Sequence, residues 1–384
     1  MATAVRPGTG RASGLRLGTV FGAPVTLAWS WFLAAVLITA IFTPWVSAYR
    51  PDLGFISAAI AFVYAVLLFA SVLLHEFAHA VAARAFGYHI VSIELNVWGG
   101  NTSFNEAPAQ DSRRARNSIV ISLVGPVTNL ALGAIGWALL DAVTPGSLPF
   151  LLLFAITFAN IALGVVNLLP GLPLDGGRAL ESVVWRIGGD KYRGTIIASW
   201  AGRGIAVLVV AYTLVWPLLQ GSTPSIFTVL WGGLIAFFMW NSASSEAKAA
   251  KIKRRVASFD LQHVSQPAIA VNQHATLLQA TTAAQQSGGG LARIIVFDES
   301  GRPSGIVEPQ TVNSIPIESW DSTNISQCTQ LLGPWIAAAA GQDTRTVLEA
   351  LSQQPHTEYV LLVKNDAITG LVETKLLFQD LMDP

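Results

Sequence analysis

The chain has 384 residues, of which 52% are hydrophobic and only 12% are charged. Soluble domains carry about 25% charged residues, so this composition excludes an ordinary soluble protein and predicts an integral membrane protein with a more polar part attached. The net charge is +0, which leaves no electrostatic case for nucleic acid as a partner. The single cysteine, Cys328, excludes an intrachain disulfide framework and a cysteine-rich metal site.

Six apolar stretches predict six membrane-spanning helices. They cover residues 24–45, 55–86, 119–140, 148–169, 204–219 and 225–241. The first stretch is too long for a signal peptide, so we interpret it as an uncleaved membrane helix. The chain then divides into a cytosolic N-terminal tail at 1–20, a membrane domain at 21–242, a polar linker at 243–256 and a soluble domain at 257–384.

The basic residues predict the orientation of these helices. Arginine and lysine gather before the first span, between the second and third, between the fourth and fifth, and after the sixth. The positive-inside rule therefore places both termini in the cytosol and the protein in the cell membrane.

The second span carries the sequence His75-Glu76-Phe77-Ala78-His79. Histidines four residues apart lie on the same face of a helix, so both imidazoles can bind one Zn²⁺ ion while the glutamate between them acts on the attacking water. The first histidine lies about 28 Å along the helix at 1.5 Å per residue, and a hydrocarbon core is about 30 Å thick. We therefore expect the ion inside the membrane, near its cytosolic side. The motif also occurs by chance in unrelated proteins. A metal site needs at least a third protein ligand, so the prediction depends on finding one elsewhere in the chain.

Asp175 is the candidate for that third ligand, because it follows the fourth span on the same side of the membrane. Prolines and glycines surround it and predict irregular backbone: Pro170, Gly171, Pro173, Gly176 and Gly177. Irregular backbone at membrane depth is tolerated only where protein buries it or where it lines a wet cavity. A carboxylate at that depth is a functional candidate, and the alternative is an ordinary helix cap in a cytosolic loop.

Strand periodicity follows the second span. Ile93, Leu95 and Val97 alternate with polar residues, and residues 98–101 form a turn signal. We predict a short strand or hairpin here, with a plain polar loop as the alternative. A strand at 92–98 would offer an edge to which an extended peptide can be added.

The C-terminal third contains a repeated pattern. Residues 293–307 and 358–372 each read as strand, turn and strand, and the helical segments 277–286 and 345–353 precede them. A repeat of this size predicts two copies of one α/β unit.

Three motifs in order carry a resemblance to a known family. These are the histidine motif, the glycine–proline–asparagine segment at 125–129, and the segment from Asn167 to Asp175. The chain resembles the site-2 protease family of intramembrane zinc metalloproteases over about residues 15–240. With its C-terminal repeat it looks like the branch that has six spans and a tandem CBS domain pair. The expected fold is thus a polytopic α-helical membrane protein with a short membrane-associated β element, plus a soluble α/β CBS pair.

The resemblance implies roles for the matching residues. His75, His79 and Asp175 would bind one zinc ion per chain, Glu76 would act as general base and then general acid, and Asn167 would orient the substrate or stabilise the oxyanion. The substrate would be a single-span membrane protein, such as an anti-sigma factor or a membrane-tethered transcription factor. It would be cut in or next to its transmembrane helix, near the cytosolic face, in regulated intramembrane proteolysis. Asn129 would have either a structural role or a role on the substrate side.

The CBS resemblance implies adenine nucleotide binding, but this chain departs from the pattern. The ribose-binding aspartate is absent from both copies, where Glu308 and Thr311 stand in the first and Glu373 and Leu376 in the second. A role in homodimerisation or substrate docking is therefore expected instead. Two rival functions remain open at this point: a CBS-regulated membrane transporter, and a non-catalytic scaffold that binds membrane helices.

Overall fold

The computed structural model describes residues 14–97, 99–105, 112–287 and 293–382. The tail arginines Arg6 and Arg11 and the turn residue Trp98 lie outside these ranges. The chain divides into two compact units, Met1–Ala250 and Lys251–Pro384.

Among the described residues, six helices are long and apolar enough to cross a membrane, as the sequence predicted. They are α1 (Trp29–Tyr49), α2 (Ile56–Ala85), α3 (Ser112–Leu139), α4 (Leu148–Asn167), α6 (Lys191–Leu219) and α7 (Ile226–Ser258). The chain is therefore a multi-pass membrane protein. Two helices are longer than expected, since α6 begins well before residue 204 and α7 continues through residues 243–256.

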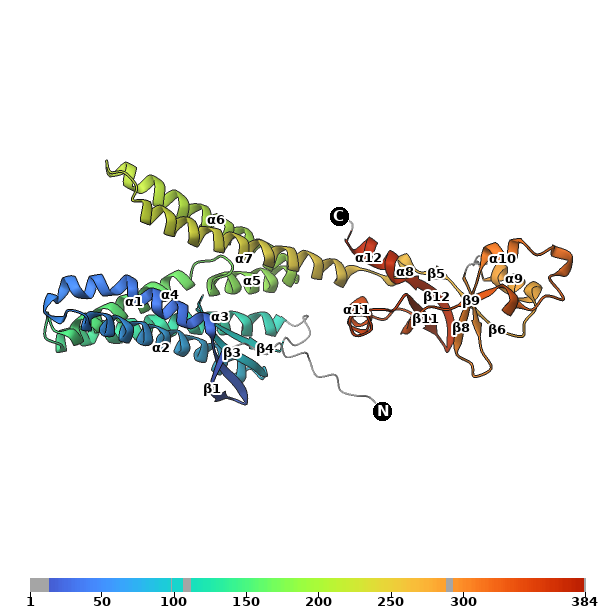
Figure 1. Cartoon of the computed structure of the whole chain (residues 1–384), viewed down its shortest axis with the longest axis horizontal. Coiled ribbons are helices and arrows are strands. Elements are labelled where there is room, and N and C mark those ends of the chain that lie inside the picture. Colours follow the sequence, from blue (N-terminus) through green and yellow to red (C-terminus); the bar gives the residue numbers. More distant parts are fainter. Residues whose placement is uncertain (1–13, 98, 106–111, 288–292, 383–384) are drawn as a thin grey trace. The chain divides into compact units, whose positions relative to one another are not determined.

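Helices α1 to α4 lie side by side in one bundle (Figure 1). Small residues allow the closest approach: a Cβ at Gly133 or Gly136 of α3 would meet Ile161 or Thr157 of α4. Glycine at helix crossings is typical of membrane bundles, because backbones can then pack in direct contact.

A four-stranded sheet lies against this bundle. Its strands are β1 (Gly14–Val20), β2 (Ala23–Ala28), β3 (Ile90–Asn96) and β4 (Gly99–Phe104), paired in that order. The β3–β4 hairpin confirms the strand predicted after the second span. The β1–β2 hairpin was missed, because residues 14–20 were assigned to the tail and 24–28 to the first helix. The short apolar run in β2 has no alternation, since β2 is almost fully buried beside β3.

The sheet order also corrects the expected position of its free edge. β3 pairs with β2 on one side and with β4 on the other, so it cannot accept a further strand. The edges are β1 and β4.

The segment before Asp175 is irregular as predicted, but Asp175 itself begins a helix, α5 (Asp175–Gly188). The expectation that glycines forbid a helix here was wrong. A Cβ at Gly176 would overlap the carbonyl of Leu168, and one at Gly177 would overlap Gly171. The two glycines therefore serve close packing of the helix start against the preceding loop rather than breaking the helix.

The C-terminal unit contains two α/β repeats. After α8 (Leu261–Val264) and β5 (Gln266–Pro267), the first repeat consists of β6 (Ile269–Asn272), α9 (Leu277–Gln286), β7 (Ile294–Phe297), β8 (Pro303–Val307), α10 (Pro309–Asn313) and β9 (Thr329–Leu331). The second consists of β10 (Trp335–Ala339), α11 (Thr344–Gln353), β11 (Tyr359–Lys364), β12 (Ala367–Glu373) and α12 (Thr374–Met382).

Each repeat forms its own sheet, in the orders β6-β7-β8-β9 and β10-β11-β12-β5. Each has a separate apolar core, built around Leu277 and Ile294 in the first and around Val360 and Leu377 in the second. A third cluster, which includes Ile295 and Leu361, joins the two sheets. The repeated α/β unit predicted from the sequence is confirmed.

Candidate metal centre

Three predicted ligands come together where α2 meets the start of α5. The Nε2 atoms of His75 and His79 lie 3.1 Å apart. The Oδ2 atom of Asp175 lies 3.0 Å from the first and 3.5 Å from the second. Two imidazole nitrogens and one carboxylate oxygen are a donor set that zinc uses in catalytic sites, where a fourth position stays open.

Hydrogen bonds on the far side of each imidazole fix its orientation. The Nδ1 atom of His75 lies 2.6 Å from Oδ1 of Asn129, and Nδ1 of His79 lies 2.6 Å from the carbonyl oxygen of Ile121. Both partners are acceptors, so each Nδ1 carries the proton and each Nε2 presents its lone pair to the site. Asn129 thus orients the His75 ring, which is a structural role and not a contact with the substrate.

Gly125 leaves the space that a metal ion would need. A Cβ at this position would overlap Nε2 of His79 and lie 2.6 Å from Nε2 of His75. The helix α3 therefore faces both ligand nitrogens with bare backbone at this point. The donors and the space in front of them fit a zinc ion.

Glu76 is buried beside the ligands and is held by β4. The Thr102 hydroxyl donates to Oε2 of Glu76 at 2.7 Å and lies 3.1 Å from its backbone carbonyl oxygen. A Cβ at Gly100 would overlap the Glu76 side chain, so the strand lies directly on it. Sequence reasoning missed Thr102 and Gly100. The only signal was the turn at residues 98–101, which was interpreted as a turn alone.

Asn167 is the last residue of α4. Its side chain is half-buried, and it makes no hydrogen bond within the described part of the chain. The structure therefore does not tie it to the three ligands, and its catalytic role stays a prediction.

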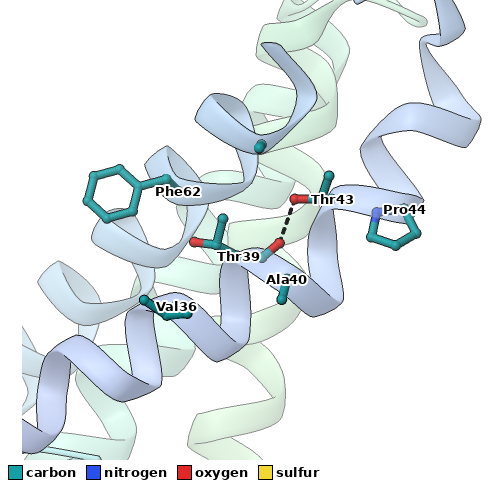
Figure 2. Close-up of a pocket in the computed structure, with 7 residues that line it drawn as sticks. Val36, Thr39, Ala40, Thr43, Pro44 and Phe62 are labelled. Carbon is teal, nitrogen blue, oxygen red and sulfur yellow. Dashed lines mark hydrogen bonds between the residues drawn. The ribbon is translucent and has the colours of Figure 1, made fainter. Parts of the chain in front are cut away.

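An apolar groove between α1 and α2 is separate from this chemistry (Figure 2). It has a volume of about 450 Å³ and is lined by Val36, Thr39, Ala40, Thr43, Pro44, Ala58 and Phe62. The Thr43 hydroxyl donates to the carbonyl oxygen of Thr39 at 2.6 Å, which satisfies it inside the apolar wall. No lining residue is ionisable, so the groove offers no catalytic group.

Comparisons with known proteins match the segment that contains the cluster. The model of peptidase family M50 matches residues 63–147 and 141–211. A protein of Synechocystis whose name describes a zinc metalloprotease is 26% identical over 94% of this chain and 93% of its own length. One of Mycobacterium tuberculosis, named in the same way, is 27% identical over 93% of this chain and 90% of its own length.

Solved structures were also matched. The site-2 protease of Methanocaldococcus jannaschii aligns with 61% of this chain and 95% of its own, at 25% identity and a TM-score of 0.42. The CBS domain of a bacterial CNNM/CorC family Mg²⁺ transporter aligns with 34% of this chain and 92% of its own, at 14% identity and a TM-score of 0.23. The family match covers the histidine motif, the residue 125–129 segment and Asp175 together, so the segment that contains the cluster is similar to peptidase family M50.

Proposed function

We propose that the chain is a zinc metalloprotease that cleaves a membrane-anchored protein in or next to its transmembrane helix, near the cytosolic face. One observation carries the proposal: His75 and His79 of α2, a helix long and apolar enough to cross a membrane, converge with Asp175 at the start of α5, with a buried glutamate beside them. The names of the Synechocystis and Mycobacterium relatives support zinc as the metal and proteolysis as the activity.

Each residue of the site has a defined role in this proposal. His75, His79 and Asp175 hold the ion, which when bound supplies the Lewis acidity that makes water a nucleophile at neutral pH. Glu76 removes the proton from the attacking water and then donates it to the leaving amine. Asn167 donates to the developing oxyanion, a contact that contributes about 3–4 kcal/mol in comparable reactions. Its side chain has no hydrogen-bond partner among the described residues, which suits it for this contact.

The substrate must be extended when it is cut. Carbonyl groups of an intact transmembrane helix are hydrogen-bonded internally and covered by side chains, so they cannot be attacked. β4 is a free edge of the sheet and lies on Glu76. An unwound substrate segment paired with this edge would have its backbone next to the general base.

The remaining assignments follow from the sequence. Both termini face the cytosol, and residues 21–242 carry the protease, with a tail at 1–20 and a linker at 243–256. The substrate is a single-span protein, such as an anti-sigma factor or a membrane-tethered transcription factor. Residues 257–384 form a regulatory CBS-like pair through which two chains associate.

Replacing Glu76 with glutamine removes the general base while keeping the side chain's size. Zinc content should stay at one ion per chain, and the cleavage rate should fall by about 10²–10⁴-fold. The measurement is cleavage of a tagged single-span substrate in liposomes, run beside wild type and a chelated sample, with zinc quantified in each.

Three other results would contradict the proposal. Absence of stoichiometric zinc in the wild type would remove its basis. Substrate binding without product would favour a scaffold. Ion flux across the same liposomes, without cleavage, would favour a transporter.

Replacing Gly125 with alanine should prevent zinc binding. The added methyl group would lie against the ligand nitrogens, where the ion is expected, and α3 cannot shift without breaking its packing on α4. Zinc content after purification is the measurement. Gly204→Ala in α6 is the control, since a Cβ there meets no atom within 4 Å. Full zinc content in Gly125→Ala would mean that the ion lies elsewhere.

Replacing Thr102 with valine should lower kcat about tenfold or more with zinc content unchanged, because a hydrogen bond to a charged group contributes about 1.5–3 kcal/mol. Thr102→Ser keeps the hydroxyl and should recover most of the rate. Steady-state kinetics on the same substrate separate kcat from KM. Equal loss in both variants would show that the threonine methyl group matters, and not the hydrogen bond.

A cysteine at Asn101, an exposed residue of β4, should form disulfides with substrate cysteines at alternating positions. The two-residue period follows from strand pairing, in which successive side chains point to opposite faces. Leu17→Cys in β1 is the matched control, because it lies on the other edge of the same sheet and is also exposed. The native Cys328 is buried and lies outside the membrane domain. Crosslinks without a two-residue period, or equal crosslinking from both edges, would argue against pairing at β4.

A further inference from the structure

A chain of buried hydrogen bonds extends from His75 across three membrane helices. Nδ1 of His75 meets Oδ1 of Asn129 on α3. Nδ2 of Asn129 donates to Oδ1 of Asn160 on α4 at 3.1 Å. Nδ2 of Asn160 donates to the Ser71 hydroxyl oxygen on α2 at 3.0 Å and to the carbonyl oxygen of Ile156 at 2.9 Å. The side chains beyond His75 are almost fully enclosed, with Asn129 1%, Asn160 3% and Ser71 6% exposed.

Backbone carbonyl groups at the far end of this hydrogen-bond chain determine which side-chain atoms donate and which accept. The carbonyl oxygen of Ile156 can only accept, so the Asn160 amide must turn its nitrogen toward it. The Ser71 hydroxyl donates to the carbonyl oxygen of Leu67 at 3.1 Å, so it too presents a lone pair to Asn160. The oxygen of Asn160 is then left facing Asn129.

The orientation of the Asn160 amide in turn determines that of the Asn129 amide. Facing an oxygen, Asn129 must turn its nitrogen toward Asn160 and its own oxygen toward His75. The imidazole can satisfy that oxygen only with a proton on Nδ1, which leaves Nε2 unprotonated. A flip of Asn129 would place an N–H against Nδ1 and favour the tautomer whose protonated Nε2 cannot bind a metal, and a flip of Asn160 would present its N–H to Asn129 and so favour that flip.

We propose that Asn160 and Ser71 are positioning residues that, through Asn129, hold His75 in its metal-binding tautomer. His79 needs no such chain, because its Nδ1 donates directly to the carbonyl oxygen of Ile121. For His75 the acceptor is the amide side chain of Asn129 on α3. An amide has two opposite orientations, so its orientation has to be fixed by further partners. The inference rests on the proposed function only in taking His75 as a zinc ligand.

The decisive experiment is a double-mutant cycle on zinc affinity. The apparent Kd for zinc of the full-length protein in detergent is measured by competition with a chromophoric chelator. Asn160→Leu should weaken zinc binding about tenfold, the lower end of the 10–100-fold range for loss of an outer partner of a ligand. Asn129→Asp provides the second background of the cycle, because a carboxylate presents an acceptor to His75 in either orientation, and its own zinc affinity is the reference for the combined variant.

The prediction that separates orientation from packing concerns the combined variant. In the Asn129→Asp background, Asn160→Leu should cost no zinc affinity, since no amide is left to orient. An equal loss in both backgrounds would overturn the proposal and leave Asn160 a packing residue. If Asn160→Leu does not fold, Ser71→Ala tests the same point, with a smaller loss in the wild type and none in the Asn129→Asp background.

Two controls complete the design. Thr157→Val removes a buried hydroxyl of α4 that has no hydrogen-bond partner among the described residues, and it should leave zinc affinity unchanged. His75→Ala tests the assumption about the ligand. Unchanged zinc binding in His75→Ala would refute the proposed metal site itself. Weak binding in His75→Ala together with wild-type binding in Asn160→Leu and Ser71→Ala would refute the orienting chain alone.

Discussion

Polar atoms in the membrane domain must find their partners inside the protein, because lipid offers none. Around the metal-ligand cluster this constraint leaves each group with one satisfied arrangement. The two histidines have acceptors behind them, Asp175 lies against their ring nitrogens, and the hydroxyl of Thr102 holds Glu76. Helix packing and these hydrogen bonds therefore hold the side chains of the site in place.

Glycine makes this packing close enough. Gly125 brings α3 against the ligand nitrogens, and Gly100 brings β4 against Glu76. The glycines after Asp175 let the first turn of α5 rest on the loop that precedes it. At each of these points a single methyl group would separate the elements that carry the catalytic groups. The glycines of this domain are thus part of the site, although they carry no chemistry of their own.

The sequence revealed the parts of the site that have a period or a motif. Four-residue spacing identified His75 and His79, and alternation identified the β3 strand. β2 was hidden because a short buried strand has the same apolar composition as the helix that follows it. Thr102 and Asn160 were hidden for a different reason: they are isolated polar residues, and their partners lie on elements that only the fold brings together. In the C-terminal unit the sequence showed which residues replace the expected aspartate, but not that the Thr311 hydroxyl donates to Glu308 at 2.6 Å.

Under the proposed function, the contact between β4 and Glu76 would link substrate specificity to turnover. The strand proposed to receive the substrate also carries the Thr102 hydroxyl that holds Glu76, the proposed general base. Only one residue separates Thr102 from Gly100, which packs on the Glu76 side chain. A substrate that pulls β4 out of place would disturb its own hydrolysis, whereas one that fits the edge would leave the base aligned. Selection among membrane helices can then act on reaction rate, with no need for tight binding. Substitutions in β4 that change the substrate preference of the enzyme would therefore also change its catalytic rate.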